Sequence, residues 1–229
     1  MPEFVNGKRK VWNPLSRYYV EPFGEWIAER LKKTPITPNF VSVVNTILGV
    51  LSSWLILLGT PFAVFIFGVW VRFFHAFDIT DGHLARVKNI KSKYGGLLDA
   101  VGDRLVNGVW PAVIAYTLFI RSNNLIYLYA GLSLLVGLYM YMVTSMKADV
   151  YYGVNKGDDT GREAAKSNVL GKVFLFFIDN DIQLHVLTLS ALFNRLDIYL
   201  FFYAIYFHLV WIAYLGFYTL QHLRAGKNI

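Results

Sequence analysis

The sequence contains no cysteine, which excludes a disulfide framework and thiol chemistry. It also has neither a glycine-rich P-loop nor a Ser-His-Asp set that would indicate nucleotide hydrolysis or acyl transfer. Charged residues make up only 16% of the chain, whereas hydrophobic residues make up 55% and aromatic residues 17%. The 229 residues therefore predict one membrane domain, with no room for a second globular one.

Six apolar stretches are each near the roughly 20 residues that a helix needs to cross a bilayer. They predict an all-α polytopic membrane protein with six transmembrane helices. The second and third are short because their ends carry aspartates. The stretches are 40–59, 62–77, 96–120, 125–146, 169–193 and 198–220.

The N-terminal region, residues 1–36, is expected to be a juxtamembrane segment before the six-helix domain, residues 37–229. Residues 15–33 alternate aromatic and charged side chains at helical spacing, which predicts an amphipathic helix in the membrane interface, with Pro22 as a bend. The alternative is an ordinary soluble helix packed on a loop. No cleavable signal peptide is visible, so the first spanning helix is expected to direct insertion.

The basic residues lie mostly on one side of the predicted spans. With the N-terminus inside, the inner segments hold eighteen Lys and Arg and the outer loops hold two, Arg121 and Arg195. This asymmetry predicts that the inner loops face the cytoplasm. We therefore expect an integral protein of the plasma membrane, or of the inner membrane in a prokaryote, and no nucleic-acid partner.

Four aspartates lie in one run between apolar segments: Asp78, Asp81, Asp99 and Asp103. A charged side chain at mid-bilayer costs about 2.5–3.5 kcal/mol, so four would cost on the order of 10 kcal/mol without compensation. Divalent cations are the simplest compensation. The alternative is a salt-bridged loop in which the carboxylates are incidental.

The spacing of the aspartates favours one shared site. Asp78 and Asp81 are three residues apart, and Asp99 and Asp103 are four apart, so each pair shares a helix face. Two such helices side by side would direct four carboxylates at one volume. Hard oxygen ligands of this kind suit Mg²⁺ or Mn²⁺.

Small residues beside the carboxylates leave room for a ligand. Gly82 and Ala85 fall near the face that carries the first pair, and Gly95 lies at the head of the next helix. Two cations there would stabilise the charge of a phosphoryl group. A weakly liganded carboxylate would take a proton from an attacking hydroxyl.

The pattern D-x2-D-G-x2-A-R-x8-G-x3-D-x3-D, from Asp78 to Asp103, resembles the signature of the class I CDP-alcohol phosphatidyltransferases. Every defined position is matched. The resemblance implies an enzyme of phospholipid biosynthesis that moves the phosphatidyl or similar group of a CDP-alcohol, such as CDP-diacylglycerol, to a second alcohol and releases CMP. It also implies dependence on Mg²⁺ or Mn²⁺ at a two-metal site, and a homodimer, which is common in the family.

Carried over position by position, the resemblance makes Asp78, Asp81 and Asp99 the principal metal ligands. Asp103 would be a ligand and also the general base. In the motif, the residues that would line the nucleotide pocket are Gly82, Ala85, Arg86 and Gly95.

The segment from Pro38 to Ser42 also looks like a family element near the nucleotide, with Asn39 and Ser42 as the contacts. The same segment is equally well explained as a plain helix start. In that interpretation Thr37 is the N-cap and Pro38 is the first helical residue.

Three cations flank the third inner loop and would hold a phosphate on the acceptor alcohol: Lys147, Arg162 and Lys166. The alternative is ordinary positive-inside charge in contact with lipid headgroups. Family members that use inositol phosphate often show Lys-Ala-Arg here, whereas this chain has Lys147-Ala148-Asp149. This difference weakens the case for inositol phosphate as the acceptor alcohol. The other candidate acceptors are glycerol phosphate, inositol, serine and a diradylglycerol.

Three polar residues interrupt the fifth apolar stretch and match no motif: Asp179, Asp181 and His185. They indicate a broken helix, a polar partner for Arg72, or a span boundary placed wrongly. His75 and His83 lie close to the aspartates in sequence. Because oxygen-rich metal sites rarely need imidazole, neither is expected to be a ligand.

A cation- or proton-coupled transporter is the other class of function that intramembrane carboxylates indicate. Transporters place such groups near the bilayer midplane and often contain inverted repeats. Here the carboxylates lie at one end of the predicted spans and no repeat is visible, so the enzyme is favoured.

Overall fold

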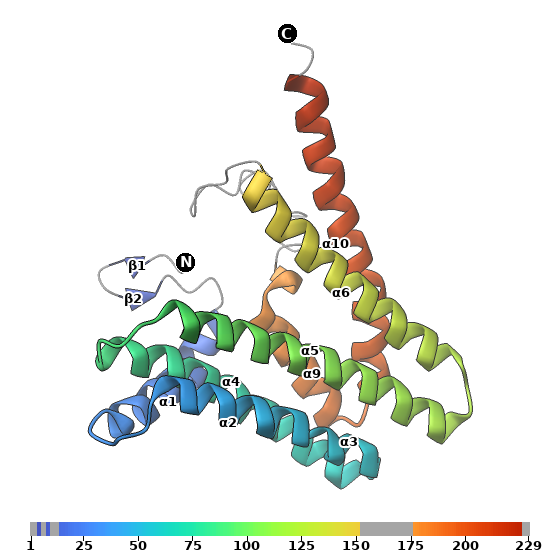
Figure 1. Ribbon diagram of the computed structural model, residues 1–229. Helices are drawn as coiled ribbons and strands as arrows, with labels where there is room; N and C mark the ends of the chain where they lie inside the picture. Colours follow the sequence, from blue (N-terminus) through green and yellow to red (C-terminus); the bar gives the residue numbers. More distant parts are fainter. Residues whose placement is uncertain (1–3, 6–7, 10–13, 152–175, 226–229) are drawn as a thin grey trace.

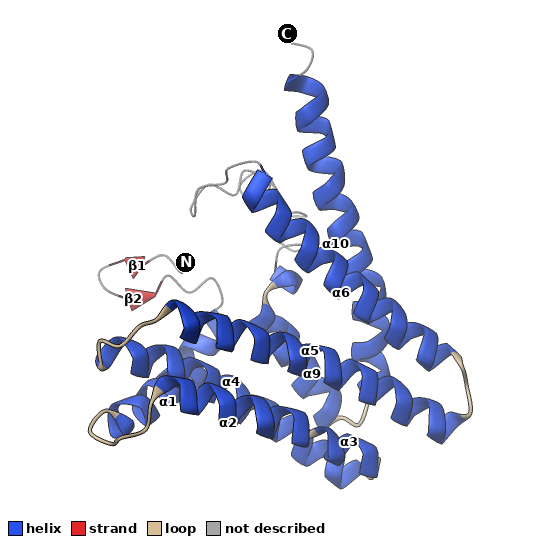
Figure 2. Ribbon diagram, viewed as in Figure 1, coloured by secondary structure: helices blue, strands red, loops and turns tan. Residues whose placement is uncertain are grey.

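A computed structural model describes residues 4–5, 8–9, 14–151 and 176–225, which are almost entirely helical (Figures 1 and 2). Two strands of two residues, β1 (Phe4–Val5) and β2 (Lys8–Arg9), pair antiparallel near the N-terminus. The helices are α1 (Pro14–Leu31), α2 (Pro38–Leu51), α3 (Ser53–Leu58), α4 (Pro61–Val87), α5 (Lys93–Ser122), α6 (Ile126–Tyr151), α9 (Asn180–Leu192) and α10 (Leu196–Ala225).

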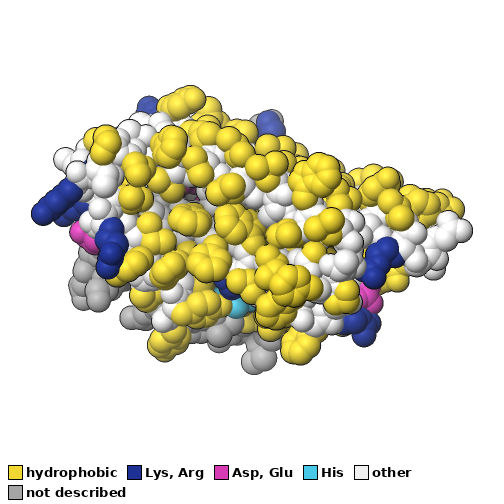
Figure 3. All heavy atoms as spheres, turned by 90° about the horizontal axis from the view of Figure 1, so that it is seen from below, with side chains coloured by type: hydrophobic (Ala, Val, Ile, Leu, Met, Phe, Trp, Pro, Cys, Tyr) yellow, Lys and Arg dark blue, Asp and Glu magenta, His cyan; other side chains and the backbone are white. Residues whose placement is uncertain are grey.

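The all-α polytopic membrane fold predicted from hydropathy is confirmed. Among the described residues, five stretches are long and apolar enough to span a bilayer: Pro38–Leu58, Pro61–Val87, Lys93–Ser122, Ile126–Lys147 and Leu196–Leu220. Figure 3 shows apolar side chains over most of one face, with charged side chains gathered toward its two ends. This distribution is the one expected of a belt that faces lipid.

The predicted fifth span, 169–193, is described only from residue 176 onward. Within it α9 has 13 residues, so it is about 20 Å long at 1.5 Å per residue and shorter than the bilayer core of about 30 Å. Asp179 is the N-cap of α9 and accepts a hydrogen bond from the backbone N–H of Asp181. The helix break predicted at these polar residues is therefore present, and the sixth crossing stays a prediction.

The two helices that carry the aspartates extend further than hydropathy indicates. The second stretch continues in α4 to Val87, and the third begins in α5 at Lys93. Both pairs of aspartates therefore lie on spanning helices. Only residues 88–92 connect these helices, so α4 and α5 present their carboxylates at the same end of the bundle.

Helix starts are fixed by side-chain caps. The predicted cap at Thr37 is confirmed, since its hydroxyl accepts from the backbone N–H of Phe40 and Pro38 opens α2. Ser92 caps α5 in the same way by accepting from the N–H of Gly95 at 2.9 Å. Each cap satisfies an N–H that has no partner within its helix.

The first predicted span is not one continuous helix, because it is interrupted at Ser52 between α2 and α3. The Ser52 hydroxyl donates to the carbonyl of Gly49 at 2.5 Å. The indole N–H of Trp110, on α5, lies 2.8 Å from the same carbonyl and 3.1 Å from the Ser52 hydroxyl. A buried indole thus satisfies the polar groups at the break and ties α2 to α5.

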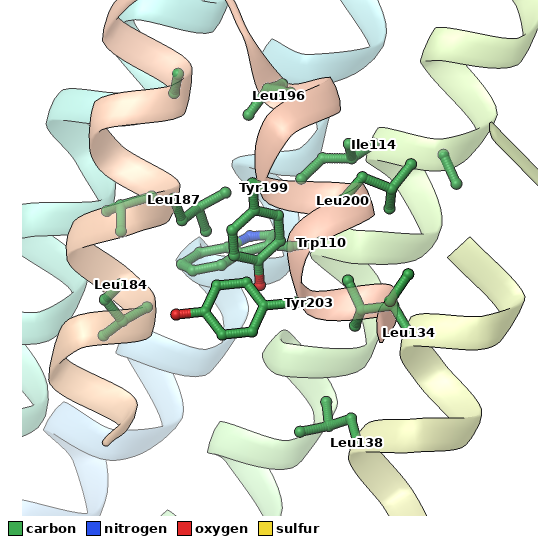
Figure 4. Packing of buried hydrophobic residues seen from close by; sticks show 14 of the residues in the cluster. Trp110, Ile114, Leu134, Leu138, Leu184, Leu187, Leu196, Tyr199, Leu200 and Tyr203 are labelled. Carbon is green, nitrogen blue, oxygen red and sulfur yellow. The ribbon is translucent and has the colours of Figure 1, made fainter. Parts of the chain in front are cut away.

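The largest buried cluster joins α4, α5, α6, α9 and α10. Figure 4 shows side chains of α5, α6, α9 and α10 meeting around Trp110, Tyr199 and Tyr203. From α4, Phe67 and Phe74 contact the Trp110 ring edge-on, with centroids 5.3 and 5.0 Å away. Trp110 is therefore packed from several sides. Its contacts hold α4 and α5 together in the part of the bundle next to the end that carries the aspartates.

The N-terminal helix α1 packs against α4. Its Val20 and Ala28 are buried, whereas Tyr18 and Trp26 are 78% and 51% exposed. One side therefore faces protein and the other carries exposed aromatic rings, as an amphipathic interfacial helix requires. Pro22 lies inside α1, which continues through it.

We expect Trp110→Phe to destabilise the fold by about 1–3 kcal/mol, because it removes the N–H donor from two buried acceptors while keeping an aromatic ring. Thermal unfolding of the purified protein in detergent measures the loss. The control is Trp54→Phe, since Trp54 is 66% exposed. Equal unfolding temperatures for the two variants would contradict the role given to the indole N–H.

Candidate active site

Three of the four aspartates form one cluster. Carboxylate oxygens of Asp78 on α4 and of Asp99 and Asp103 on α5 all lie within 4.8 Å of one another. The three residues are half-buried. In the part of the chain that the structure describes, no other three acidic or histidine side chains converge in this way.

Asp81 lies beside this cluster but is held differently. It is 6% exposed, and its carboxylate accepts a hydrogen bond from the hydroxyl of Ser42 on α2. It interacts electrostatically with Asp99 and Asp103. The structure thus brings all four predicted carboxylates to one end of α4 and α5, with Asp81 anchored to a third helix.

The donor set fits a divalent cation. Three half-buried carboxylates at this separation repel one another strongly unless a positive charge lies among them. Carboxylate oxygen is the ligand type that Mg²⁺ and Mn²⁺ prefer. The residues that would hold such ions are Asp78, Asp99 and Asp103, with Asp81 adjacent.

The residues predicted to contact a nucleotide surround the same end of the bundle. A Cβ added to Gly95 would lie 2.8 Å from the side-chain oxygen of Asn39, so the starts of α2 and α5 meet at this glycine. Within the described part of the chain, a Cβ added to Gly82 would meet only the Arg86 guanidinium, at 3.7 Å. Open space therefore lies beside Gly82, and the half-buried Ala85 follows one turn later on α4.

The hydroxyl of Ser42, a predicted nucleotide contact, makes hydrogen bonds within the protein, and its contact with a nucleotide stays a prediction. It lies 3.2 Å from the carbonyl of Pro38 and donates to Asp81. In this structure Ser42 orients a carboxylate, which is a role that the sequence pattern does not indicate.

The predicted acceptor cluster is only partly described. Lys147 is exposed near the end of α6. Arg162 and Lys166 lie outside the described residues, so the convergence of the three cations stays a prediction.

The two histidines near the motif contact different helices. His75 Nδ1 lies 3.3 Å from the carboxylate of Asp181 on α9. His83 lies between Glu25 and Glu29 of α1, at 3.7 and 3.6 Å. Arg72 interacts electrostatically with Asp181, which is the polar partner suggested for it by the sequence.

Lys88 is a functional candidate that sequence reasoning missed, since it counted only as an inner basic residue. Its ammonium donates to the carbonyls of Thr34 and Ile36 at 2.6 and 2.7 Å. These carbonyls belong to the connection between α1 and α2. Lys88 therefore ties the end of the motif helix to the segment that positions Asn39 and Ser42.

A model of the CDP-alcohol phosphatidyltransferase family matches residues 35–220, which include the whole carboxylate cluster. The chain belongs to the CDP-alcohol phosphatidyltransferase family. The predicted family is therefore confirmed, and the transporter alternative is set aside.

Two relatives of the chain have names that state an activity. A "Bifunctional IPC transferase and DIPP synthase" of Thermococcus kodakarensis is 34% identical over 102 residues, or 44% of this chain and 22% of the relative. A "Phosphatidylinositol phosphate synthase" of Corynebacterium glutamicum is 33% identical over 99 residues, or 43% of this chain and 42% of the relative. The matched region thus spans less than half of each relative's length.

Solved structures with the same fold come from phosphatidylinositol phosphate synthase of Mycobacterium tuberculosis. The structure with CDP-DAG bound has a TM-score of 0.63 at 22% identity, covering 87% of this chain and 92% of that one. The complex with manganese and citrate has a TM-score of 0.60 at 21% identity, covering 84% and 87%. At these sequence identities, the structural similarity is evidence for the fold of the present chain and not for its substrates.

We expect Lys88→Met to raise the KM for the nucleotide donor with a smaller effect on kcat, because it frees the start of α2 without touching a carboxylate. Hydrogen bonds to a charged group are worth about 1.5–3 kcal/mol, so a roughly tenfold rise in KM is reasonable. Steady-state kinetics with varied donor measures the change.

The matched control is Lys33→Met, since Lys33 is exposed on the same connection. A normal KM in Lys88→Met, or an equal rise in the control, would remove Lys88 from this role.

Proposed function

We propose that the chain is a divalent-metal-dependent phosphatidyltransferase that moves the phosphatidyl group of CDP-diacylglycerol to an alcohol and releases CMP. The observation that carries the proposal is the convergence of Asp78, Asp99 and Asp103 within 4.8 Å, on two helices that match the family signature. Family membership gives the reaction class. The substrates and the residue roles are proposals.

The metal ions and the pocket residues would together bind the CDP-alcohol donor. Mg²⁺ or Mn²⁺ held by the aspartates would neutralise the pyrophosphate charge of the donor. Asn39, Gly82, Ala85, Arg86 and Gly95 would line the pocket for the cytidine and its phosphates. Gly82 and Gly95 suit this role because their missing side chains leave space or allow close approach.

Asp103 would act as the general base. Its carboxylate would accept the proton of the acceptor hydroxyl as that oxygen forms a bond to the phosphatidyl phosphorus. The bond from this phosphorus to the CMP oxygen would break, and CMP would leave with the electron pair. A positioned carboxylate typically contributes about 10²–10⁴-fold to such a step.

The site would face the cytoplasm, as the distribution of Lys and Arg predicts. One named relative, a phosphatidylinositol phosphate synthase, favours an inositol-phosphate acceptor for this chain. Asp149 stands where family members that use inositol phosphate often have an arginine, and this argues for an acceptor alcohol of lower negative charge. Lys147, Arg162 and Lys166 would hold an acceptor phosphate if one is present. The homodimer expected from the resemblance belongs to the same proposal.

The first test is CMP release by the purified protein in lipid nanodiscs, with CDP-diacylglycerol and a panel of alcohols that includes inositol phosphate, inositol, glycerol phosphate and serine. We expect release only with Mg²⁺ or Mn²⁺ and only with the correct alcohol. Asp103→Asn should lower kcat by about 10²–10⁴-fold. Near-normal turnover in this variant would exclude Asp103 as the base.

The second test measures metal binding without turnover. Asp99→Asn should weaken Mn²⁺ binding, followed by electron paramagnetic resonance, by about tenfold or more, because it removes one charged ligand. The control is Asp197→Asn. Asp197 lies in the first turn of α10, and its carboxylate forms an ion pair with Arg195 at 2.9 Å, outside the cluster. Equal Mn²⁺ affinities in the two variants would contradict the proposed ligand set.

A further inference from the structure

We propose that α1 is a positioning element of the carboxylate site, and that its close contact at Gly24 holds the part of α4 that carries Asp78 and Asp81. This inference rests on the proposed function only through the metal site. It concerns a helix that the sequence predicts merely as an interfacial anchor.

The two helices touch backbone to backbone at Gly24. A Cβ added there would lie 2.8 Å from the carbonyl oxygen of Ala76 and 2.9 Å from the side chain of Ile79. The hydroxyl of Thr80, which is fully buried, also lies 3.2 Å from the Gly24 carbonyl. Only glycine allows this approach without a shift of one helix.

This contact lies directly behind the aspartates. Successive residues of an α-helix are turned by about 100°, since a turn takes 3.6 residues. Ala76, Ile79 and Thr80 therefore share one side of α4, while Asp78 and Asp81 share the opposite side. α1 supports the rear of the helix segment whose front carries the carboxylates.

The N-terminal part of α1 is fastened to the start of α9. The hydroxyl of Ser16 donates to the carboxylate of Asp181. Nδ1 of His185 lies 2.7 Å from the carbonyl of Asp181 and donates to it, and Nε2 is hydrogen-bonded to the hydroxyl of Tyr19, from which it accepts when the imidazole is neutral. Because His75 of α4 also contacts Asp181 at 3.3 Å, this carboxylate joins α1, α4 and α9.

The C-terminal part of α1 is fastened to the end of α4. Ala28 and Leu84 are both fully buried and pack with Val41 of α2. α1 therefore contacts α4 on both sides of the Gly24 crossing, since the rings of Phe23 and Phe73 also meet edge-on with centroids 6.0 Å apart. Metal sites need their ligands within about 0.5 Å of the productive geometry, and packing behind the ligand-bearing element supplies that precision.

The test is Gly24→Val, which adds atoms where the two backbones meet. We expect Mn²⁺ affinity, measured by electron paramagnetic resonance in nanodiscs, to fall by about 10–100-fold, the usual effect of disturbing groups that orient metal ligands. The matched control is Gly216→Val on α10, where an added Cβ would meet none of the described residues within 4 Å. Its Mn²⁺ affinity should equal that of the wild type.

Thermal unfolding of the metal-free variants separates positioning from stability. If α1 acts only on stability, Gly24→Val will unfold at a lower temperature but bind Mn²⁺ with wild-type affinity per folded molecule, and the proposal is overturned. If Gly24→Val does not fold, the pair Ser16→Ala and Tyr19→Phe removes the hydrogen bonds to α9 without added bulk. Wild-type Mn²⁺ affinity in that double variant would equally overturn the proposal.

Failure of the role proposed for α1 can be told apart from failure of the proposed transferase function. A wild-type protein that binds no Mn²⁺ and releases no CMP would refute the metal-dependent transferase itself. A wild type that does both, together with an unchanged Gly24→Val, would refute only the role of α1.

Discussion

The mutual repulsion of carboxylates at one end of a membrane bundle is the constraint on which the rest of the structure depends. Two unit charges 4.8 Å apart repel by about 3–4 kcal/mol at an effective dielectric constant of 20. Two such pairs, Asp78 with Asp99 and Asp78 with Asp103, would push α4 and α5 apart unless packing holds the helices and cations complete the site. The buried aromatic cluster around Trp110 and close helix contacts on both sides of α4 oppose this repulsion.

Glycines at three helix crossings make these contacts possible. Gly24 brings α1 onto the rear of α4, and a Cβ at Gly49 would lie 2.8 Å from the side chains of Phe74 and Val106. At Gly102, one residue before a cluster aspartate, a Cβ would collide with Thr46 of α2. The helices that carry or support the carboxylates therefore approach more closely than side chains of ordinary size would permit, and the positions of the charges become fixed by backbone packing.

The sequence predicted most of the fold and the centre of the site, because both depend on short-range periodicity. Asp78 and Asp81 share a face by spacing alone, and apolar length marks the spanning helices. The interruption at Ser52 was not predicted, since it depends on an indole 58 residues away. Lys88 and Gly24 were missed for the same reason: one binds carbonyls more than 50 residues distant, and the other is defined by the helix it touches. Hydropathy and spacing carry no information on such contacts.

Asp81 links the carboxylate cluster to the proposed nucleotide pocket in one packed unit. Its carboxylate is buried and bonded to Ser42, and Ser42 lies one helical turn from Asn39, which meets Gly95 at the head of α5. Any displacement of α2 would therefore move Asp81 and the predicted cytidine contact together. Lys88 closes the same unit from the other end by fixing the connection that leads into α2. In the proposed site, binding of the donor and binding of the metal would be coupled through shared elements, since a donor that orders the start of α2 would also order the carboxylate beside the ions.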